Sequence, residues 1–355
     1  MSGKCPLANA VATHAIDPGW LRSQQYDLTL IRDMTFIAIL SGIVVSLNPA
    51  MFGVILVADL WLLGYHHVIA TMTRLAFDGQ SLRQHRFLVF VLPVLVFGAT
   101  FLLAWQVGIW IIASIYLYWQ WFHYTRQSWG ISQAYRRKAG ERASDNPLLT
   151  KSCFYLVPAY GILYRSWQAP DMFLYQELRV IPVPELLVNF VGALALSTFL
   201  LWAAGRVVAW RAGRLAPAHT YFMLSHFAIF TIGYRFIDDI THGWLVINIW
   251  HNSQYILFVW LFNTNRFKGG IEPSARFLSW LSQSHNKIRY FLVCFGISTA
   301  VYAAVLLAVG KDMIAGLPLA VLVYQAINFH HYIVDSVIWK MRKKPLRQNL
   351  GLEDA

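Results

Sequence analysis

The sequence carries little charge for its length. Of its 355 residues 13% are charged and 57% are hydrophobic, whereas a soluble domain usually has about a quarter of its residues charged. At half that density the chain has too little polar surface to cover a water-exposed globule of this size. The composition therefore excludes an ordinary soluble protein.

Cysteine is also scarce. Cys5, Cys153 and Cys294 are far apart and form no CxxC pair, which excludes a disulfide framework and a thiolate zinc ribbon. A thiolate copper or iron–sulfur site is disfavoured for the same reason. The first 25 residues lack a basic segment followed by an apolar one, so we expect no cleaved signal peptide, and insertion should rely on the first span.

Long apolar runs are what the sequence has in place of charge. A membrane-spanning helix needs roughly 20 predominantly apolar residues, and we predict an all-α, polytopic helix bundle with residues 1–355 forming one membrane domain. The fifth predicted span is short and contains Pro158 and Arg165, so eight or nine crossings with a re-entrant segment is the alternative. The ten predicted spans are 33–50, 53–75, 87–105, 107–128, 153–168, 184–209, 220–239, 244–263, 288–309 and 314–339.

The basic residues predict the orientation. The net charge of +12 would suit nucleic acid in a soluble protein, but here Lys and Arg stand just beyond the apolar runs and mainly in alternate loops, as in cytoplasmic loops. We therefore expect a multi-pass protein, of the inner membrane if it is bacterial, with no nucleic-acid partner. The tails 1–30 and 340–355 and the polar loop 127–151 should be cytoplasmic.

Seven of the twelve histidines lie within predicted spans, where ionisable residues are costly and usually functional. His67 precedes Arg74 by seven residues, and His331 precedes Lys340 by nine. At ~1.5 Å per residue, four helices place imidazoles at a similar depth in the cytoplasmic half, with His251 nearer the middle. Hydrophobic packing would not align them, so we predict a metal site. The predicted metal ligands are His66, His67, His123, His226, His251, His330 and His331.

Polar neighbours at helical spacing support these histidines. Asp335 follows His331 by four residues, so a carboxylate and an imidazole meet one turn apart. We predict catalytic roles for Asp335 and Tyr255. Hydrogen bonding between helices is the alternative role for such residues. The residues predicted to support the ligands are Asp59, Gln127, Asn248, Gln254 and Asn328.

Histidine with carboxylate suits iron, zinc or copper. We favour a non-haem iron oxygenase, desaturase or hydroxylase that acts on a lipid or isoprenoid and in some cases needs an electron donor. A cytochrome with haem b held by two histidines, and a transporter coupled to protons or a metal, are the alternatives.

Four histidine-bearing segments carry a family resemblance: GYHHVIATMTR (64–74), WQWFHYTRQSWG (119–130), IWHNSQY (249–255) and NFHHYIVDSVIWK (328–340). The scattered arrangement resembles the histidine-rich membrane non-haem iron oxygenases. It is closer to the Brp/Blh type of β-carotene-cleaving dioxygenases than to the desaturases, whose HxxxH and HxxHH clusters are absent. The resemblance implies a long apolar polyene as substrate. It also implies iron ligands, or their close neighbours, at His66, His67, His123, His251 and His331.

Overall fold

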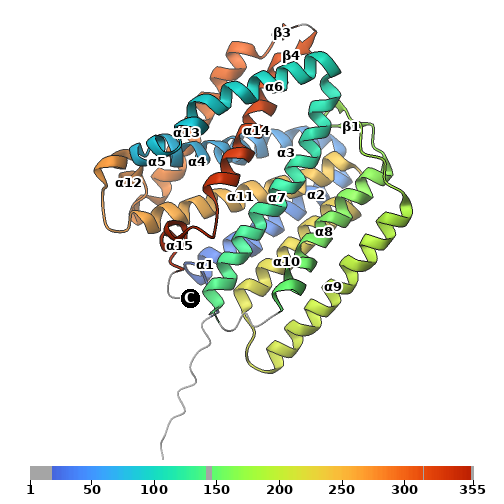
Figure 1. Cartoon of the computed structure of the whole chain (residues 1–355), viewed down its shortest axis with the longest axis vertical. Helices are drawn as coiled ribbons and strands as arrows, with labels where there is room; N and C mark the ends of the chain where they lie inside the picture. Colours follow the sequence, from blue (N-terminus) through green and yellow to red (C-terminus); the bar gives the residue numbers. More distant parts are fainter. Residues whose placement is uncertain (1–17, 141–145, 315, 353–355) are drawn as a thin grey trace, which may run out of the picture.

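The computed structural model describes residues 18–140, 146–314 and 316–352. These residues are almost entirely helical, which confirms the predicted all-α class (Figure 1). Two short antiparallel pairs are the strands found in the described ranges. β1 (Met172–Phe173) pairs with β2 (Gln176–Glu177), and β3 (Met313–Ile314) pairs with β4 (Leu317–Pro318).

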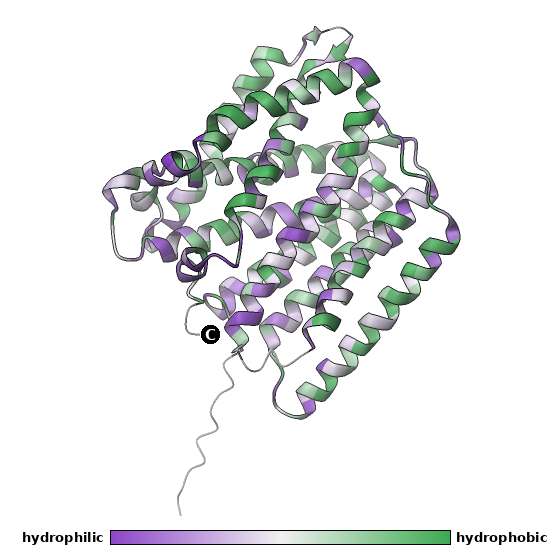
Figure 2. Ribbon diagram, viewed as in Figure 1, coloured by the Kyte–Doolittle hydropathy of each residue, from purple (hydrophilic) through white to green (hydrophobic). Residues whose placement is uncertain are grey.

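Five helices are long and apolar enough to cross a membrane, which indicates a membrane protein. Their outward faces expose large apolar side chains, for example Leu47 at 81% and Leu307 at 89%, as expected where lipid covers the surface. Figure 2 shows this on α9, a largely hydrophobic helix at the edge of the bundle. The five are Gln24–Leu47 (α1, η1 and α2), Pro49–Ala76 (η2, α3, η3 and α4), Phe87–Val107 (η4 and α6), Glu185–Arg211 (α9) and Ser284–Val309 (η8 and α13).

Five further helices carry more polar residues and direct them into the bundle. The most enclosed is α11, which packs against α2, α4, α7 and α10 and is buried along most of its length. Their bounds are Ile109–Ala139 (α7), Pro147–Gln168 (α8), Pro217–Thr231 (α10, continued by η6 at Ile232–Phe236), Ile240–Arg266 (α11) and Leu319–Ile338 (α14).

Three segments show more helix than a plain reading of the apolar runs indicates. The expected loop 127–151 is largely helix, because α7 continues to Ala139 and α8 begins at Pro147. The fifth predicted span is one continuous helix, with Pro158 inside it. Part of the expected C-terminal tail is also ordered, since α15 (Lys344–Asn349) buries Leu346 in a hydrophobic cluster.

The bundle has two distinct ends. The hairpin end carries β1–β2 and β3–β4, at the upper right of Figure 1. The basic end carries α5 (Gly79–Gln84), α12 (Arg276–Leu281) and α15, on the left side of Figure 1. Polar colours gather at this basic end in Figure 2. The site described next lies in the interior between the two ends.

Candidate metal centre

Four buried side chains from three helices converge on one point. They are His67 of α4, His123 of α7, and His331 and Asp335 of α14, and we call them the central group. One ligand atom from each lies within 4.8 Å of all the others. The closest pair is His67 Nε2 and His331 Nε2, 2.6 Å apart. Asp335 Oδ2 is 3.5 Å from His331 Nε2 and 4.0 Å from His123 Nε2. This buried group can hold a metal ion.

The free atoms of the group fit a cation. His123 Nε2 and Asp335 Oδ2 are buried and have no hydrogen-bond partner among the described residues, although buried polar atoms nearly always have one. Ligands with metal bonds of 2.0–2.1 Å lie roughly 3.3 Å apart in a tetrahedral site. The observed separations, from 2.6 Å to 4.8 Å, bracket that value. Small side-chain movements would therefore complete a coordination sphere.

A π-turn decides which of the two adjacent histidines joins the group. The turn η3 (Leu60–Gly64) lies between Asp59 and the histidines, and a π-turn holds one extra residue. That residue rotates the following helix by about 100°. Asp59 therefore shares its face with His67, eight residues on, and not with His66 as a regular helix would have it. His66 instead packs against Phe291, with ring centroids 6.0 Å apart.

Hydrogen bonds hold the ligands in orientation. Thr71 Oγ1 lies 3.0 Å from His331 Nδ1 and donates to Asp335 Oδ1 at 3.2 Å. The Tyr255 hydroxyl donates to the same Oδ1 at 2.9 Å and accepts from Trp339 Nε1 at 2.8 Å. These bonds occupy Nδ1 of the imidazole and Oδ1 of the carboxylate, which directs Nε2 and Oδ2 towards the centre. Partners of this kind tune metal ligands.

Thr71 and Trp339 were not predicted as functional residues. The sequence could have indicated Thr71, because it follows His67 by one helical turn and lies on the same face of α4. Arg74, one turn further, lies with its guanidinium carbon 3.9 Å from the centroid of the Trp339 ring and donates to the carbonyl of Ile338. It thereby fixes the indole that supports Tyr255 and caps the C-terminus of α14.

His251 lies beside the central group. Its ring centroid is 4.8 Å from that of His67, 5.1 Å from that of His123 and 4.0 Å from that of Tyr124. It lines a small cavity of about 20 Å³ together with Asn248 and other polar residues. His251 is thus a neighbour of the four converging atoms, close enough to support them.

The structure does not bring His226 and His330 into the central group. Each ring instead donates a hydrogen bond to a backbone carbonyl that has no helical N–H partner, because a proline stands at the position that would supply it. Phe154 would bond to the N–H of residue 158, which is Pro158 and has none. His226 Nε2 bonds this carbonyl at 3.1 Å, and Ser128 Oγ lies 2.9 Å from its Nδ1.

His330 plays the same part beside η4 (Phe87–Val91). The π-turn directs the N–H of Leu92 to the carbonyl of Phe87, and the next residue is Pro93. The carbonyl of Leu88 therefore has no backbone donor from either position. His330 Nε2 bonds it at 2.7 Å.

The predicted supporting residues lie around the group at different distances from it. Asn248 donates to Asp59 Oδ2 at 2.5 Å and accepts from the Tyr124 hydroxyl at 2.5 Å. Gln127 donates to the carbonyl of His251 at 3.2 Å. Asn328 lines the 20 Å³ cavity. The Gln254 amide is buried, with no hydrogen-bond partner in the described ranges.

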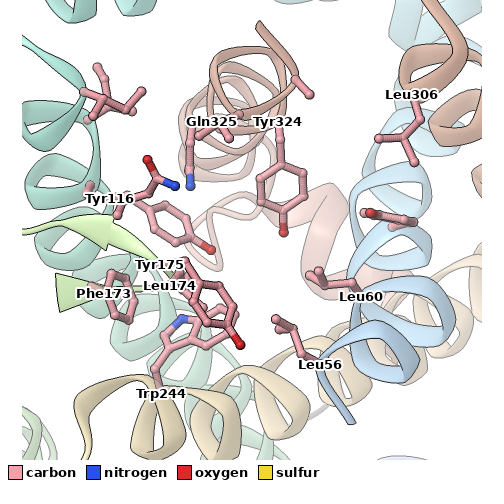
Figure 3. A pocket seen from close by; sticks show the side chains of 17 residues that line it. Leu56, Leu60, Tyr116, Phe173, Leu174, Tyr175, Trp244, Leu306, Tyr324 and Gln325 are labelled. Atoms are coloured by element: carbon pink, nitrogen blue, oxygen red, sulfur yellow. The ribbon is translucent and has the colours of Figure 1, made fainter. Parts of the chain in front are cut away.

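Two larger pockets lie on opposite sides of the group. The pocket at the hairpin end has a volume of about 270 Å³ and an apolar lining that includes Leu56, Leu60 and Trp244 (Figure 3). Tyr116 and Tyr324 stand in its wall and also in the wall of the 20 Å³ cavity. The pocket at the basic end, about 420 Å³, contains residues of the central group itself in its lining.

Comparison with known proteins adds no family. No protein-family model, no curated protein and no solved structure matches the chain. The resemblance to membrane dioxygenases stays a prediction from the four histidine segments.

Proposed function

We propose that the protein is a membrane-embedded metalloenzyme in which His67, His123, His331 and Asp335 hold the metal. The convergence of three imidazoles and one carboxylate within 4.8 Å carries this proposal. His123 Nε2 and Asp335 Oδ2 have no hydrogen-bond partner among the described residues, which supports it, because a buried carboxylate oxygen without a partner is costly unless a cation lies beside it.

The donor set favours iron in a non-haem oxidoreductase, with an oxygenase acting on a lipophilic substrate as the leading class. Imidazole and carboxylate ligands with open positions are typical of iron oxygenases, and zinc and copper also accept such donors. The bound metal would supply the redox chemistry. The chain itself orients the ligands through Thr71 and Tyr255 and holds the Tyr255 proton against Asp335 Oδ1.

Haem b fits the geometry less well. His67 Nε2 and His331 Nε2 face each other at 2.6 Å, and the carboxylate of Asp335 stands beside them. The cavity next to these rings, about 20 Å³, has room for a molecule the size of water. A macrocycle would have to separate helices α4 and α14, which are packed together.

Metal-coupled transport is the second candidate function. Pockets on both sides of the central group favour it, since a transported ion needs a route from each face. Retention of the metal distinguishes the two: an enzyme cofactor should stay bound through desalting, whereas a transported ion should exchange.

We also propose that the chain crosses the membrane ten times with both termini in the cytoplasm. The five more polar helices are each long enough to cross, at 20 to 31 residues. They are less apolar because their polar side chains face the interior of the bundle and not lipid. Basic residues gathered at the end with α5, α12 and α15 support a cytoplasmic position for that end.

The test is metal analysis and an optical spectrum of the detergent-purified protein after desalting. We expect about one first-row metal ion per chain, mainly iron, and no Soret band. A Soret band of stoichiometric intensity would replace the proposal with the cytochrome. Protein that binds a metal only in rapid exchange would favour transport.

A further inference from the structure

We infer that the substrate is a single-chain amphiphile with an anionic head, a carboxylate or a phosphate, which reaches the central group through the pocket at the basic end. The inference rests on the proposed function and narrows its substrate class. The head would be held by Arg126, Lys340 and Arg342, and the chain would lie against the aromatic wall of the same pocket.

The residues that line the two pockets indicate by which pocket the substrate reaches the central group. The lining of the basic-end pocket includes His123 and Asp335, both of the central group, and Tyr255. The lining of the hairpin-end pocket contains none of the four, and the side chains of Tyr116 and Tyr324 stand between it and the cavity beside the group (Figure 3). A molecule in the basic-end pocket therefore touches the proposed ligands directly.

Unpaired positive charge marks the mouth of this pocket. Lys340 and Arg342 make no side-chain hydrogen bond or ion pair with any described residue, and Arg126 makes only a long contact, 3.4 Å, with the Tyr155 hydroxyl. By contrast, Arg266 at the same end is paired with Asp78 at 2.8 Å. Three cations around one cavity attract an anion and strengthen one another's effect.

The rest of the wall suits a hydrocarbon chain. The volume of the basic-end pocket, about 420 Å³, lies within the range of small-molecule sites. Lys340 follows Asp335 by five residues, and both line this pocket, so an anion held at Lys340 lies near the central group. The reacting carbons would then be close to the head of the chain. Besides Tyr255, the aromatic residues of the wall are Trp119, Phe122, Trp129, Phe258, Tyr332 and Trp339.

A neutral hydrocarbon is disfavoured on the same grounds. It would cover the charges of Lys340, Arg342 and Arg126 without any compensating partner, which is costly. The competing explanation is that these residues only anchor the bundle to lipid headgroups, as basic residues at a membrane boundary commonly do. Anchoring would require no preference among ligands inside the pocket.

The experiment measures equilibrium binding of radiolabelled palmitate, lysophosphatidate and hexadecanol to the full chain in neutral phosphatidylcholine nanodiscs. We expect palmitate or lysophosphatidate to bind at least 10-fold more tightly than hexadecanol, and the two anions decide between carboxylate and phosphate. The double variant K340Q/R342Q should weaken binding of the preferred anion about 10-fold. The matched control K343Q/K344Q removes the same charge from neighbouring exposed positions outside the pocket lining and should leave binding unchanged.

Two results would overturn the inference: equal binding of hexadecanol and the anions, or equal losses in the two double variants. The latter would show general surface attraction. Metal content is measured on the same samples, which separates this inference from the proposed function. Selective anion binding by metal-free protein would support the pocket and contradict the metal centre, whereas bound metal without selectivity would overturn the pocket alone.

Discussion

The molecule contains two kinds of buried histidine, and they differ in what their ring nitrogens meet. His226 and His330 each donate to a backbone carbonyl left free beside a proline. In the central group, imidazole nitrogens from separate helices face one another and a carboxylate. Burial is similar in both places, so burial alone does not indicate a metal site. The convergence of acceptor atoms does.

The difference has an energetic basis. A histidine that bonds a free carbonyl satisfies both partners, and the protein alone completes the arrangement. Three imidazole nitrogens and a carboxylate oxygen directed at one point cannot satisfy one another without a shared proton or a cation, since lone pairs repel. The first kind of site should therefore govern stability, and the second should govern metal binding.

The largest expected effect separates two adjacent histidines. His331→Gln removes a proposed ligand and should lower metal affinity by more than about 100-fold, since losing a supporting residue alone typically costs 10–100-fold. His330→Gln is the matched control, because its ring bonds the Leu88 carbonyl, and should keep the metal. Metal content after desalting, measured for both variants, checks this. Loss of metal in both, or in neither, would erase the distinction between the two kinds of histidine.

The next effect comes from the residue that orients the ligands. Thr71→Val keeps the shape of the side chain but removes the hydroxyl that contacts His331 Nδ1 and Asp335 Oδ1. We expect metal affinity to fall by about 10–100-fold, as measured by competition with a chelator. Thr73→Val is the control on the same helix, since its hydroxyl donates to the carbonyl of Ala70 and contacts no ligand of the central group among the described residues. Equal affinities for the two variants would show that Thr71 has no special role.

The smallest effect is on stability alone. His226→Leu leaves the carbonyl of Phe154 without its donor and should lower the free energy of unfolding by about 1–3 kcal/mol, with the metal retained. Pro158→Ala restores a backbone N–H to that carbonyl and should recover part of the loss in the double variant. Thermal unfolding of both single variants and the double variant gives the coupling. Strict additivity would refute the proline explanation.

Much of the fold could be predicted from the sequence, because the apolar runs correspond to helices in nearly every case. The run at 87–105 corresponds to the helix Phe87–Val107. The boundary at 127 was wrong because amphipathic residues extend α7 to Ala139 beyond the apolar part. Hydropathy indicates where the apolar part of a helix ends, and the helix itself can continue beyond that point.

The site was predictable only in part, for two physical reasons. Spacing along a regular helix would align Asp59 with His66, but the π-turn Leu60–Gly64 brings His67 onto that face instead. Spacing also cannot reveal that a histidine bonds a backbone carbonyl on another helix. His226 donates to the carbonyl of Phe154, which Pro158 cannot bond because it has no N–H. Predicted depth in the membrane therefore gave too many metal ligands, although three of the predicted histidines do converge with Asp335.

The most direct test of the central claim is X-ray absorption spectroscopy of the purified protein at the edge of its bound metal. We expect a shell of nitrogen and oxygen ligands at about 2.0–2.2 Å, with the outer scattering of about three imidazoles, no sulfur and no porphyrin pattern. The same spectrum from His330→Gln should be unchanged. Sulfur ligation, a porphyrin pattern, or scattering from fewer than two imidazoles would contradict the metal centre at His67, His123, His331 and Asp335.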